Sequence, residues 1–282
     1  MAAMRALMQA DKSDPYLNDM LLWIVAQKQV QRWDNPMTAV GVARLLLDID
    51  SGANLHAAER PQMILDGVAL DSMRPATMAT RRAKYEGREP ELHLEGCVLA
   101  DVPVGISADA PRSLTVTKTS KGMSWGAVHT SFVEDMTNIS QHSSGQLTVK
   151  RSLYVQRGGK GAWKACDDAT VFHVGDKLRV RHTVHADRDM DFVCLKANNP
   201  ANVEPLSLLS GYRYLGGRGG YLSLHDSCFE LFFDEFTRGS SSVDIEYNIV
   251  RTGVYAFGAA SVECTYAPQF SGHSAGMSIK TE

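Results

Sequence analysis

The feature that most constrains the fold is the alternation of apolar and polar residues in the second half of the chain. One run places Lys177, Arg179 and Arg181 on one face and sets against them Leu178, Val180, His182 and Val184. The same period of two returns at Leu147, Val149, Leu153 and Val155, at Val243, Ile245, Tyr247 and Ile249, and at Val262, Cys264 and Tyr266. Successive side chains of a strand point to opposite faces, so each run predicts a half-buried strand. Such strands, separated by glycine-rich turns without helical stretches between them, favour an antiparallel β-sandwich over a parallel sheet.

Turn signals typical of β-structure begin near Ser51. Met63–Leu65 and Val68–Leu70 flank the dipeptide Asp66-Gly67, a pattern that predicts a β-hairpin. The polar run Gln141–Gly145 is interpreted as a linker, and a short final strand is predicted near the end of the chain. Other predicted strands in the middle of the chain are Leu92–Leu94, Val102–Ile106, Leu114–Lys118 and Ser124–Phe132.

The first 50 residues predict two helices that form a hairpin. Asp14-Pro15 and Asn35-Pro36 each supply a capping residue followed by a proline suited to a first helical turn. The apolar positions at helical spacing are Leu17, Leu21, Ile24 and Val25 in the first helix and Val40, Ala43, Leu46 and Leu47 in the second. An isolated helical hairpin leaves much apolar surface uncovered. We therefore expect this pair to belong to a larger helical domain whose remainder precedes residue 1.

Composition narrows the classes of function. A chain of 282 residues exceeds the commonest domain size of about 100–150 residues, which favours more than one domain. A formal charge of -3 gives no basic surface for nucleic acid. The longest apolar stretch, Met20–Ala26, is too short to cross a bilayer. Residues Met1–Asp14 make a poor secretory signal, so any export signal is expected upstream of this chain.

The five cysteines are scattered without the close pairs that zinc or redox motifs require. They are Cys97, Cys166, Cys194, Cys228 and Cys264. An odd number leaves at least one free thiol, and each lies within or beside an apolar stretch. The pattern favours small apolar core side chains, and no metal, cofactor or catalytic residue is assigned.

Five segments of the second half are distinctive: Gly175–Val180, Ala186–Met190, Leu209–Tyr212, Phe232–Asp234 and Tyr266–Phe270. They resemble the last, MG10-type domain of bacterial α2-macroglobulins, especially the type found in Bacteroides-like cell envelopes. Upstream, Lys118-Thr119, Gly122 and Ser124–Ala127 resemble the strand pair that precedes that domain in the family. Gln27–Gln29 with Trp33 resembles the closing helices of the family's α/α-toroid, the domain that bears its thioester.

The resemblance implies a mainly β chain in three parts. Residues 1–52 would be a helical hairpin ending the α/α-toroid, 53–143 a CUB-like β region, and 144–282 a terminal macroglobulin-like β-sandwich. It also implies a cell-envelope protein, periplasmic or surface-exposed, that traps proteases and works with its own other domains and target proteases. The family's Cys-Gly-Glu-Gln thioester motif is absent, because Cys97 is followed by Val98 and Leu99. The chain would therefore act as a non-catalytic peptidase-inhibitor module; the alternative is an adhesion or glycan-binding β-sandwich.

Two motifs have catalytic or metal-binding readings. Gly272–Gly276, Gly-His-Ser-Ala-Gly, matches the nucleophile elbow of α/β-hydrolases, but the acid and histidine that should follow have no room in the remaining residues. A glycine-rich turn is favoured. Asp187, Asp189 and Asp191 imitate the opening of a calcium loop, yet the sixth position is Phe192 and the twelfth is Asn198, where glycine and glutamate are needed. A strand-end turn with solvated carboxylates is favoured there.

The run Gly216–Gly220 can suggest a phosphate-binding nest of backbone N–H groups, but it lacks the Gly-Lys-Ser/Thr of a P-loop. A flexible hairpin loop is favoured instead. Tyr212, Tyr214 and Tyr221 flank this run. Because tyrosines at loop edges are common in interfaces, these three residues are the candidate interaction surface.

Overall fold

The computed structural model describes residues 1–11, 14–33, 35–50, 61–69, 113–119, 133–167, 169–207 and 209–282. Contacts divide the chain into two compact units, the first made of Met1–Asp11 with Pro36–His129 and the second of Lys12–Asn35 with Thr130–Glu282. Three predicted strands, Leu92–Leu94, Val102–Ile106 and Ser124–Phe132, and Cys97 lie outside the described residues. The division into residues 1–52, 53–143 and 144–282 stays a prediction.

The described part of the first unit contains two helices, α1 (Ala2–Ala10) and α3 (Pro36–Asp50). α1 was not predicted from the sequence, although alanine, methionine, leucine and glutamine favour helices. Its Met4 is fully buried. α3 begins at the predicted proline, but its buried side chains are Val42 and Leu45 among those described. Val40 and Leu47, predicted as part of its apolar stripe, are exposed. The helix is apolar on more than one side, so spacing alone did not select its buried face.

A small sheet in the same unit confirms the predicted hairpin. β1 (Gln62–Leu65) pairs antiparallel with β2 (Val68–Ala69), and Asp66 and Gly67 both have positive φ, at 50° and 83°. Two positive φ values define a type I′ turn, the reason that Asp-Gly is favoured there. β3 (Leu114–Thr117), also predicted, completes the order β2-β1-β3.

Helix α2 (Tyr16–Val30) belongs to the second unit. The Asp14 carboxylate accepts the Tyr16 backbone N–H at 2.9 Å, as expected for the predicted start of the helix. Leu17, Leu21 and Ile24 are buried as predicted, and Val30 joins the core of the β-sandwich. No helix in the described residues is long and apolar enough to span a membrane.

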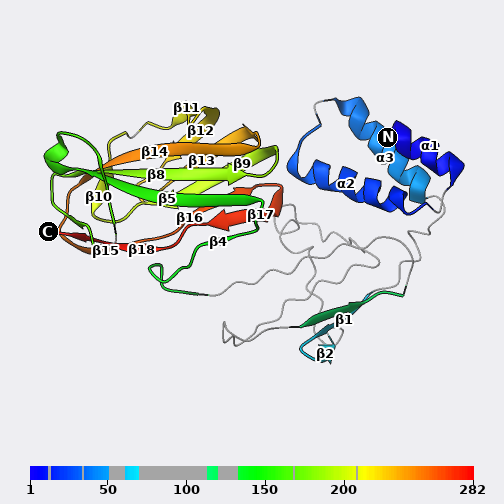
Figure 1. The fold of residues 1–282 in the computed structure, drawn as a ribbon, viewed down its shortest axis with the longest axis horizontal. Helices are drawn as coiled ribbons and strands as arrows, with labels where there is room; N and C mark the ends of the chain where they lie inside the picture. Colours follow the sequence, from blue (N-terminus) through cyan, green and yellow to red (C-terminus); the bar gives the residue numbers. More distant parts are fainter. Residues whose placement is uncertain are drawn as a thin grey trace, which may run out of the picture. The chain divides into compact units, whose positions relative to one another are not determined.

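Two antiparallel sheets make up the sandwich (Figure 1). The five-stranded sheet has the order β10 (Val203–Pro205), β14 (Gly239–Ile249), β8 (Lys177–Ala186), β5 (Leu147–Gln156) and β6 (Lys164–Ala165). The seven-stranded sheet has the order β11 (Gly211–Leu215), β12 (Arg218–Leu224), β13 (Cys228–Phe236), β9 (Met190–Asn198), β16 (Ala260–Cys264), β17 (Ala267–His273) and β4 (His142–Ser143). A third, three-stranded sheet is β15 (Gly253–Phe257), β18 (Met277–Thr281) and β7 (Val171–Phe172), with β18 and β7 parallel.

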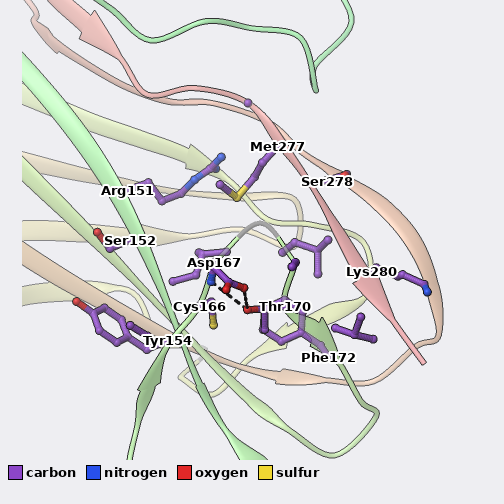
Figure 2. A pocket seen from close by; sticks show the side chains of 16 residues that line it. Arg151, Ser152, Tyr154, Cys166, Asp167, Thr170, Phe172, Met277, Ser278 and Lys280 are labelled. Carbon is purple, nitrogen blue, oxygen red and sulfur yellow. Dashed lines mark hydrogen bonds between the residues drawn. The ribbon is translucent and has the colours of Figure 1, made fainter.

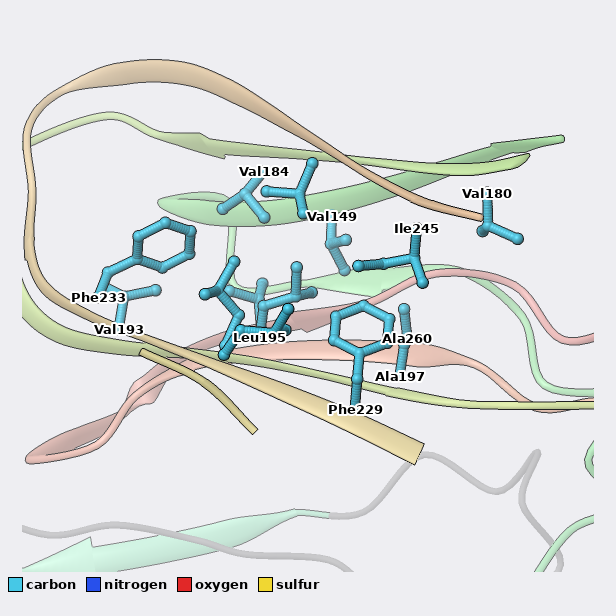
Figure 3. Packing of buried hydrophobic residues seen from close by; sticks show 14 of the residues in the cluster. Val149, Val180, Val184, Val193, Leu195, Ala197, Phe229, Phe233, Ile245 and Ala260 are labelled. Atoms are coloured by element: carbon cyan, nitrogen blue, oxygen red, sulfur yellow. The ribbon is translucent and has the colours of Figure 1, made fainter. Parts of the chain in front are cut away.

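The core fills the space between the two larger sheets. Figure 3 shows Val149, Val180, Val184 and Ile245 from one sheet facing Val193, Leu195, Ala197, Phe229 and Phe233 from the other. Burying an aliphatic or aromatic side chain of this size stabilises the fold by about 1.5–3 kcal/mol. The predicted alternation in β5, β8 and β14 is thereby confirmed, including the burial of His182 and Tyr247.

Two local predictions were wrong. The presumed linker Gln141–Gly145 contains β4, which pairs with β17 through Ser143 opposite Gly272 and His142 opposite His273. Polar residues are compatible with this position because β4 is an edge strand, exposed to solvent along one side. Tyr266 does not continue the buried pattern of Val262 and Cys264, because β16 ends at Cys264 and Tyr266 lies exposed in the following turn.

Candidate interaction surface

The three predicted tyrosines lie on the hairpin of β11 and β12. Tyr212 pairs directly with Tyr221, and their rings meet edge to face with centroids 5.4 Å apart. Tyr214 stands two residues along the same strand, opposite Gly219. The exposed fractions are 71% for Tyr212, 79% for Tyr214 and 40% for Tyr221. The structure thus brings all three together on the outer side of one sheet.

Phe232 extends this row and was not predicted. It lies on β13 opposite Tyr221 and is 41% exposed. Its neighbours Leu231 and Phe233 are buried, so strand alternation places Phe232 outward. The alternation of Phe229, Leu231 and Phe233 could have identified it from the sequence. We call Tyr212, Tyr214, Tyr221 and Phe232 the aromatic surface.

The glycine-rich run holds this hairpin in place. Gly216 and Gly217, with φ of 58° and 80°, form a two-residue turn between Leu215 and Arg218. The Ser241 hydroxyl donates to the Gly216 carbonyl at 2.8 Å, and any side chain at position 216 would collide with Ser241 and Ser242. Gly219 and Gly220 belong to β12. The predicted hairpin is confirmed, but it has a tight anchored turn in place of a flexible glycine loop.

Arg218, the first residue of β12, also anchors the hairpin through contacts with Phe236 and Thr237. Its guanidinium donates to the carbonyl of Thr237 at 2.8 Å and to the Thr237 hydroxyl, and lies 4.2 Å from the ring centroid of Phe236. A guanidinium over an aromatic face is attracted by the ring quadrupole. The aromatic surface therefore stands on a rigid support, and such a support lowers the ordering cost of binding.

The Gly272–Gly276 motif has a structural explanation. The Ser274 hydroxyl is buried, accepts the Ala260 N–H at 3.0 Å and donates to the Ala275 carbonyl at 3.2 Å. A side chain at position 272 would lie 2.7 Å from the Leu147 carbonyl oxygen, and one at 276 would collide with the Met136 carbonyl. The glycines of the motif thus allow close contact with the backbone of Leu147 and Met136. Its serine is buried and is not exposed to solvent, as a nucleophile must be.

The three aspartates of the calcium-like run also have internal partners. Asp187 pairs with Arg188 at 2.9 Å, and this hydrogen bond is the main cause of its lowered pKa. Asp189 accepts the Arg238 N–H at 2.7 Å, and Asp191 accepts the Arg32 N–H, just beyond α2, at 2.6 Å. Within the described residues, no group of three or more His, Cys, Asp or Glu side chains is placed to hold a metal ion. Asp189 and Asp191 thus connect distant chain segments, and none of the three carboxylates is simply solvated.

Two basic side chains, Arg151 and His182, point into the sandwich. Arg151 donates to the carbonyls of Gly258 at 2.5 Å and Ala275 at 2.9 Å, with its guanidinium 3.9 Å from the Phe257 ring centroid. Burial lowers the pKa of Arg151 to about 10. His182 is enclosed beside Phe229, and neither ring nitrogen has a hydrogen-bond partner. Burial, followed by the charge of Arg151, lowers the pKa of His182 to about 3, so its imidazole is neutral near pH 7.

The four described cysteines are free thiols. Cys264 is buried, and Cys166, Cys194 and Cys228 are half-buried. Desolvation raises the pKa of Cys166 and of Cys194 to about 11, so both remain protonated and poorly nucleophilic at neutral pH. The described cysteines fit the predicted packing role.

A cleft of about 800 Å³ opens between β5 and β18 (Figure 2). Arg151, Ser152 and Leu153 line it from β5, and residues 276–280 line it from the opposite wall. The loop with Cys166, Asp167 and Thr170 closes its lower end, where Thr170 donates to the Asp167 carboxylate at 2.6 Å. None of the predicted site residues lies in this cleft.

By its fold, the second unit is an antiparallel β-sandwich domain. Residues 147–269 match a family model described as the Bacterial Alpha-2-macroglobulin MG10 domain. This sandwich is therefore similar to the MG10 domains of bacterial α2-macroglobulins. The predicted Bacteroides-type subgroup stays a prediction.

Solved structures with similarity include α2-macroglobulins of two bacteria. A mutant Salmonella protein is 15% identical, with a TM-score of 0.42, over 60% of this chain and 10% of that chain. The native Escherichia coli protein, from domain MG7 to its C-terminus, is 13% identical, with a TM-score of 0.41, over 61% and 26%. The chain thus spans about a tenth to a quarter of the length of these relatives. No curated protein matches it.

Proposed function

We propose that this chain is the non-catalytic C-terminal module of an α2-macroglobulin-like protein of the cell envelope that traps proteases. The observation that carries the proposal is the match of residues 147–269 to the MG10 domain. The buried Ser274 hydroxyl is hydrogen-bonded to backbone groups, which supports a packing role for this serine and not a nucleophilic one. The parent protein would supply the remaining trap, including any bait segment and thioester.

The aromatic surface is the part of this module that we assign to contact with other domains of the parent protein or with a captured protease. Aromatic residues are enriched in interface cores because they bury much area with few rotatable bonds. Tyrosine adds a hydroxyl that can pair when it is covered. The rigid β11–β12 hairpin would present these groups without a large ordering cost.

Protease trapping can be tested on the intact parent protein. After incubation with trypsin, a trapped protease should still cleave a small chromogenic peptide but lose activity on casein, which is too large to enter a trap. The double variant Tyr212→Ala/Tyr214→Ala should lose at least about half of this protection. Full casein cleavage by trypsin mixed with the wild-type protein would contradict the proposal.

A matched control is available at Tyr266, an exposed tyrosine in the turn between β16 and β17. Tyr266→Ala should retain wild-type protection, because this residue lies outside the aromatic surface. If both variants retain protection, the tyrosines have no part in trapping. Saturable binding to a glycan array that depends on Tyr212 and Tyr214, without protease protection, would support the alternative adhesion role, since aromatic faces also stack on sugar rings.

A further inference from the structure

The cleft between β5 and β18 is bordered by two strand edges. β5 pairs with β8 along its whole length, but on its other side β6 covers only Tyr154 and Val155. β18 pairs with β15 along its whole length, but on its other side β7 covers only Lys280 and Thr281. The segments β6 and β7 thus fill the lower part of the gap, and its upper part contains no strand of the described chain.

The backbone bonding pattern shows which groups face this gap. The Leu153 carbonyl accepts the Cys166 N–H at 2.9 Å, on the side away from β8. Because this direction alternates along a strand, the N–H and C=O of Arg151 also point away from β8, into the cleft. On β18 the Glu282 N–H donates to the Phe172 carbonyl of β7 at 2.8 Å. By the same alternation, the N–H and C=O of Ser278 face the cleft from the other side.

Apolar side chains line the cleft, and a buried donor without a partner lies beside them. Leu153, Cys166 and Met277 line it, and all three are partly buried side chains packed against the sandwich core. The Arg151 Nε–H at its upper end is buried without a hydrogen-bond partner, although the same guanidinium donates to the Ala275 carbonyl across the gap. A buried donor without a partner destabilises the fold. An additional carbonyl at this position would satisfy it.

We propose that this cleft binds an extended polypeptide segment of a partner protein, which adds one strand between β5 and β18. Two strands that flank a missing one lie about 10 Å apart, twice the usual strand spacing. One arginine side chain spans this gap to Ala275. The added strand would join the five-stranded and three-stranded sheets and would cover Leu153 and Met277. It would use main-chain hydrogen bonds for affinity, as in other cases of β-strand addition.

The cleft defines the chemistry of the partner segment. Its apolar lining comprises the buried Phe172 and Ile279 and the partly buried Leu153 and Met277. Its rim carries Ser152, Ser278 and Lys280, which are exposed. A fitting segment therefore alternates apolar and polar residues and contains no proline, since proline lacks the N–H that each edge requires. This inference does not depend on protease trapping or on the aromatic surface.

The first test compares two proline variants of the full chain. Ser278→Pro removes the N–H that faces the cleft, whereas Ala256→Pro removes an N–H from the outer edge of the same three-stranded sheet, opposite Ser278. A phage library of random peptides about six residues long, the typical length of a strand, is panned on the wild-type chain. Enriched peptides should alternate apolar and polar residues. They should bind Ser278→Pro at least about tenfold more weakly and Ala256→Pro as well as wild type.

The second test uses N-methylation of one enriched peptide and does not depend on the stability of a variant. A strand held on both edges directs alternate residues to β5 and to β18. Methylating the amides of either alternate set should therefore weaken binding at least about tenfold. If one set tolerates methylation, the peptide pairs with a single edge and the proposal is wrong. It is equally overturned if no peptide is enriched, or if enriched peptides bind Ser278→Pro as well as wild type.

Discussion

The two outer faces of the sandwich differ in how their side chains are satisfied. On the five-stranded sheet, Arg179 pairs with Glu246 at 2.6 Å and Arg181 with Asp244 at 2.7 Å, each between neighbouring strands. The Arg179 guanidinium also lies 4.1 Å from the ring centroid of Trp163. These charged side chains are paired within the chain, so they need no further molecule to satisfy them.

On the seven-stranded sheet, Glu230 of β13 pairs with Lys196 of β9 at 2.7 Å, but the aromatic surface beside it is not covered in this way. Tyr212, Tyr221 and Phe232 contact one another across the strands, yet their outer surfaces remain exposed. Strands of both sheets alternate with a period of two, so alternation alone does not predict this difference. The difference lies in the residue types that face outward: the exposed aromatic side chains of the seven-stranded sheet are the ones free to contact another molecule.

The largest expected effect tests which side of β13 is inside. Phe233 is buried in the core and Phe232 is exposed beside it. Phe233→Ala should lower the free energy of unfolding by about 3–5 kcal/mol, because it removes core contacts and leaves a cavity. Phe232→Ala should change it by less than about 1 kcal/mol. Chemical denaturation measures both, and equal losses would break the distinction between inner and outer faces.

The second prediction concerns stability in acid, which depends on His182, buried between the two sheets. The folded-state pKa of His182 is depressed from 6.5 to about 3, so its contribution to stability is complete above pH 6.5 and is lost as the pH falls toward 3. At pH 5 the loss should be about 2 kcal/mol. His182→Leu should remove this part of the pH dependence of unfolding. His185→Leu, an exposed histidine of the same strand, should keep it; identical profiles for the two variants would show that His182 is solvated.

A smaller effect is expected on the charged face. The Asp244 carboxylate has a pKa lowered first by its hydrogen bond with Arg181, and it is partly exposed. Asp244→Asn should therefore cost no more than about 1 kcal/mol. The difference from wild type should shrink in high salt, because exposed charges are screened. A loss of stability that does not change with salt would show that Asp244 acts through packing and not through charge pairing.

The smallest change in stability is expected on the aromatic surface. Tyr214 is highly exposed and stands opposite a glycine, so Tyr214→Ala should change the free energy of unfolding by less than about 0.5 kcal/mol. Thermal denaturation of the variant beside Tyr266→Ala measures this. A marked destabilisation would mean that Tyr214 is a structural residue and would weaken its assignment to partner binding.

Much of the sandwich could be predicted because strand alternation has only two phases. Once Leu178 and Val180 are inside, Arg179 must be outside. Other features depended on tertiary neighbours that the pattern does not encode. The glycines at 272 and 276 are explained by the backbone of Leu147 and Met136, which are distant in sequence. Likewise, the cleft arises where β5 and β18 lack neighbours, and no local motif marks a missing strand.

The central claim is that alternate side chains of the sandwich are hidden between its sheets while the aromatic surface remains open. Hydroxyl-radical footprinting of the full chain, read by mass spectrometry, tests this residue by residue. Tyr212, Tyr214 and Phe232 should be oxidised rapidly, and Phe229, Phe233 and Tyr247 should be protected until the chain unfolds. Rapid oxidation of the second group in the folded protein, or protection of the first in the isolated chain, would contradict the account.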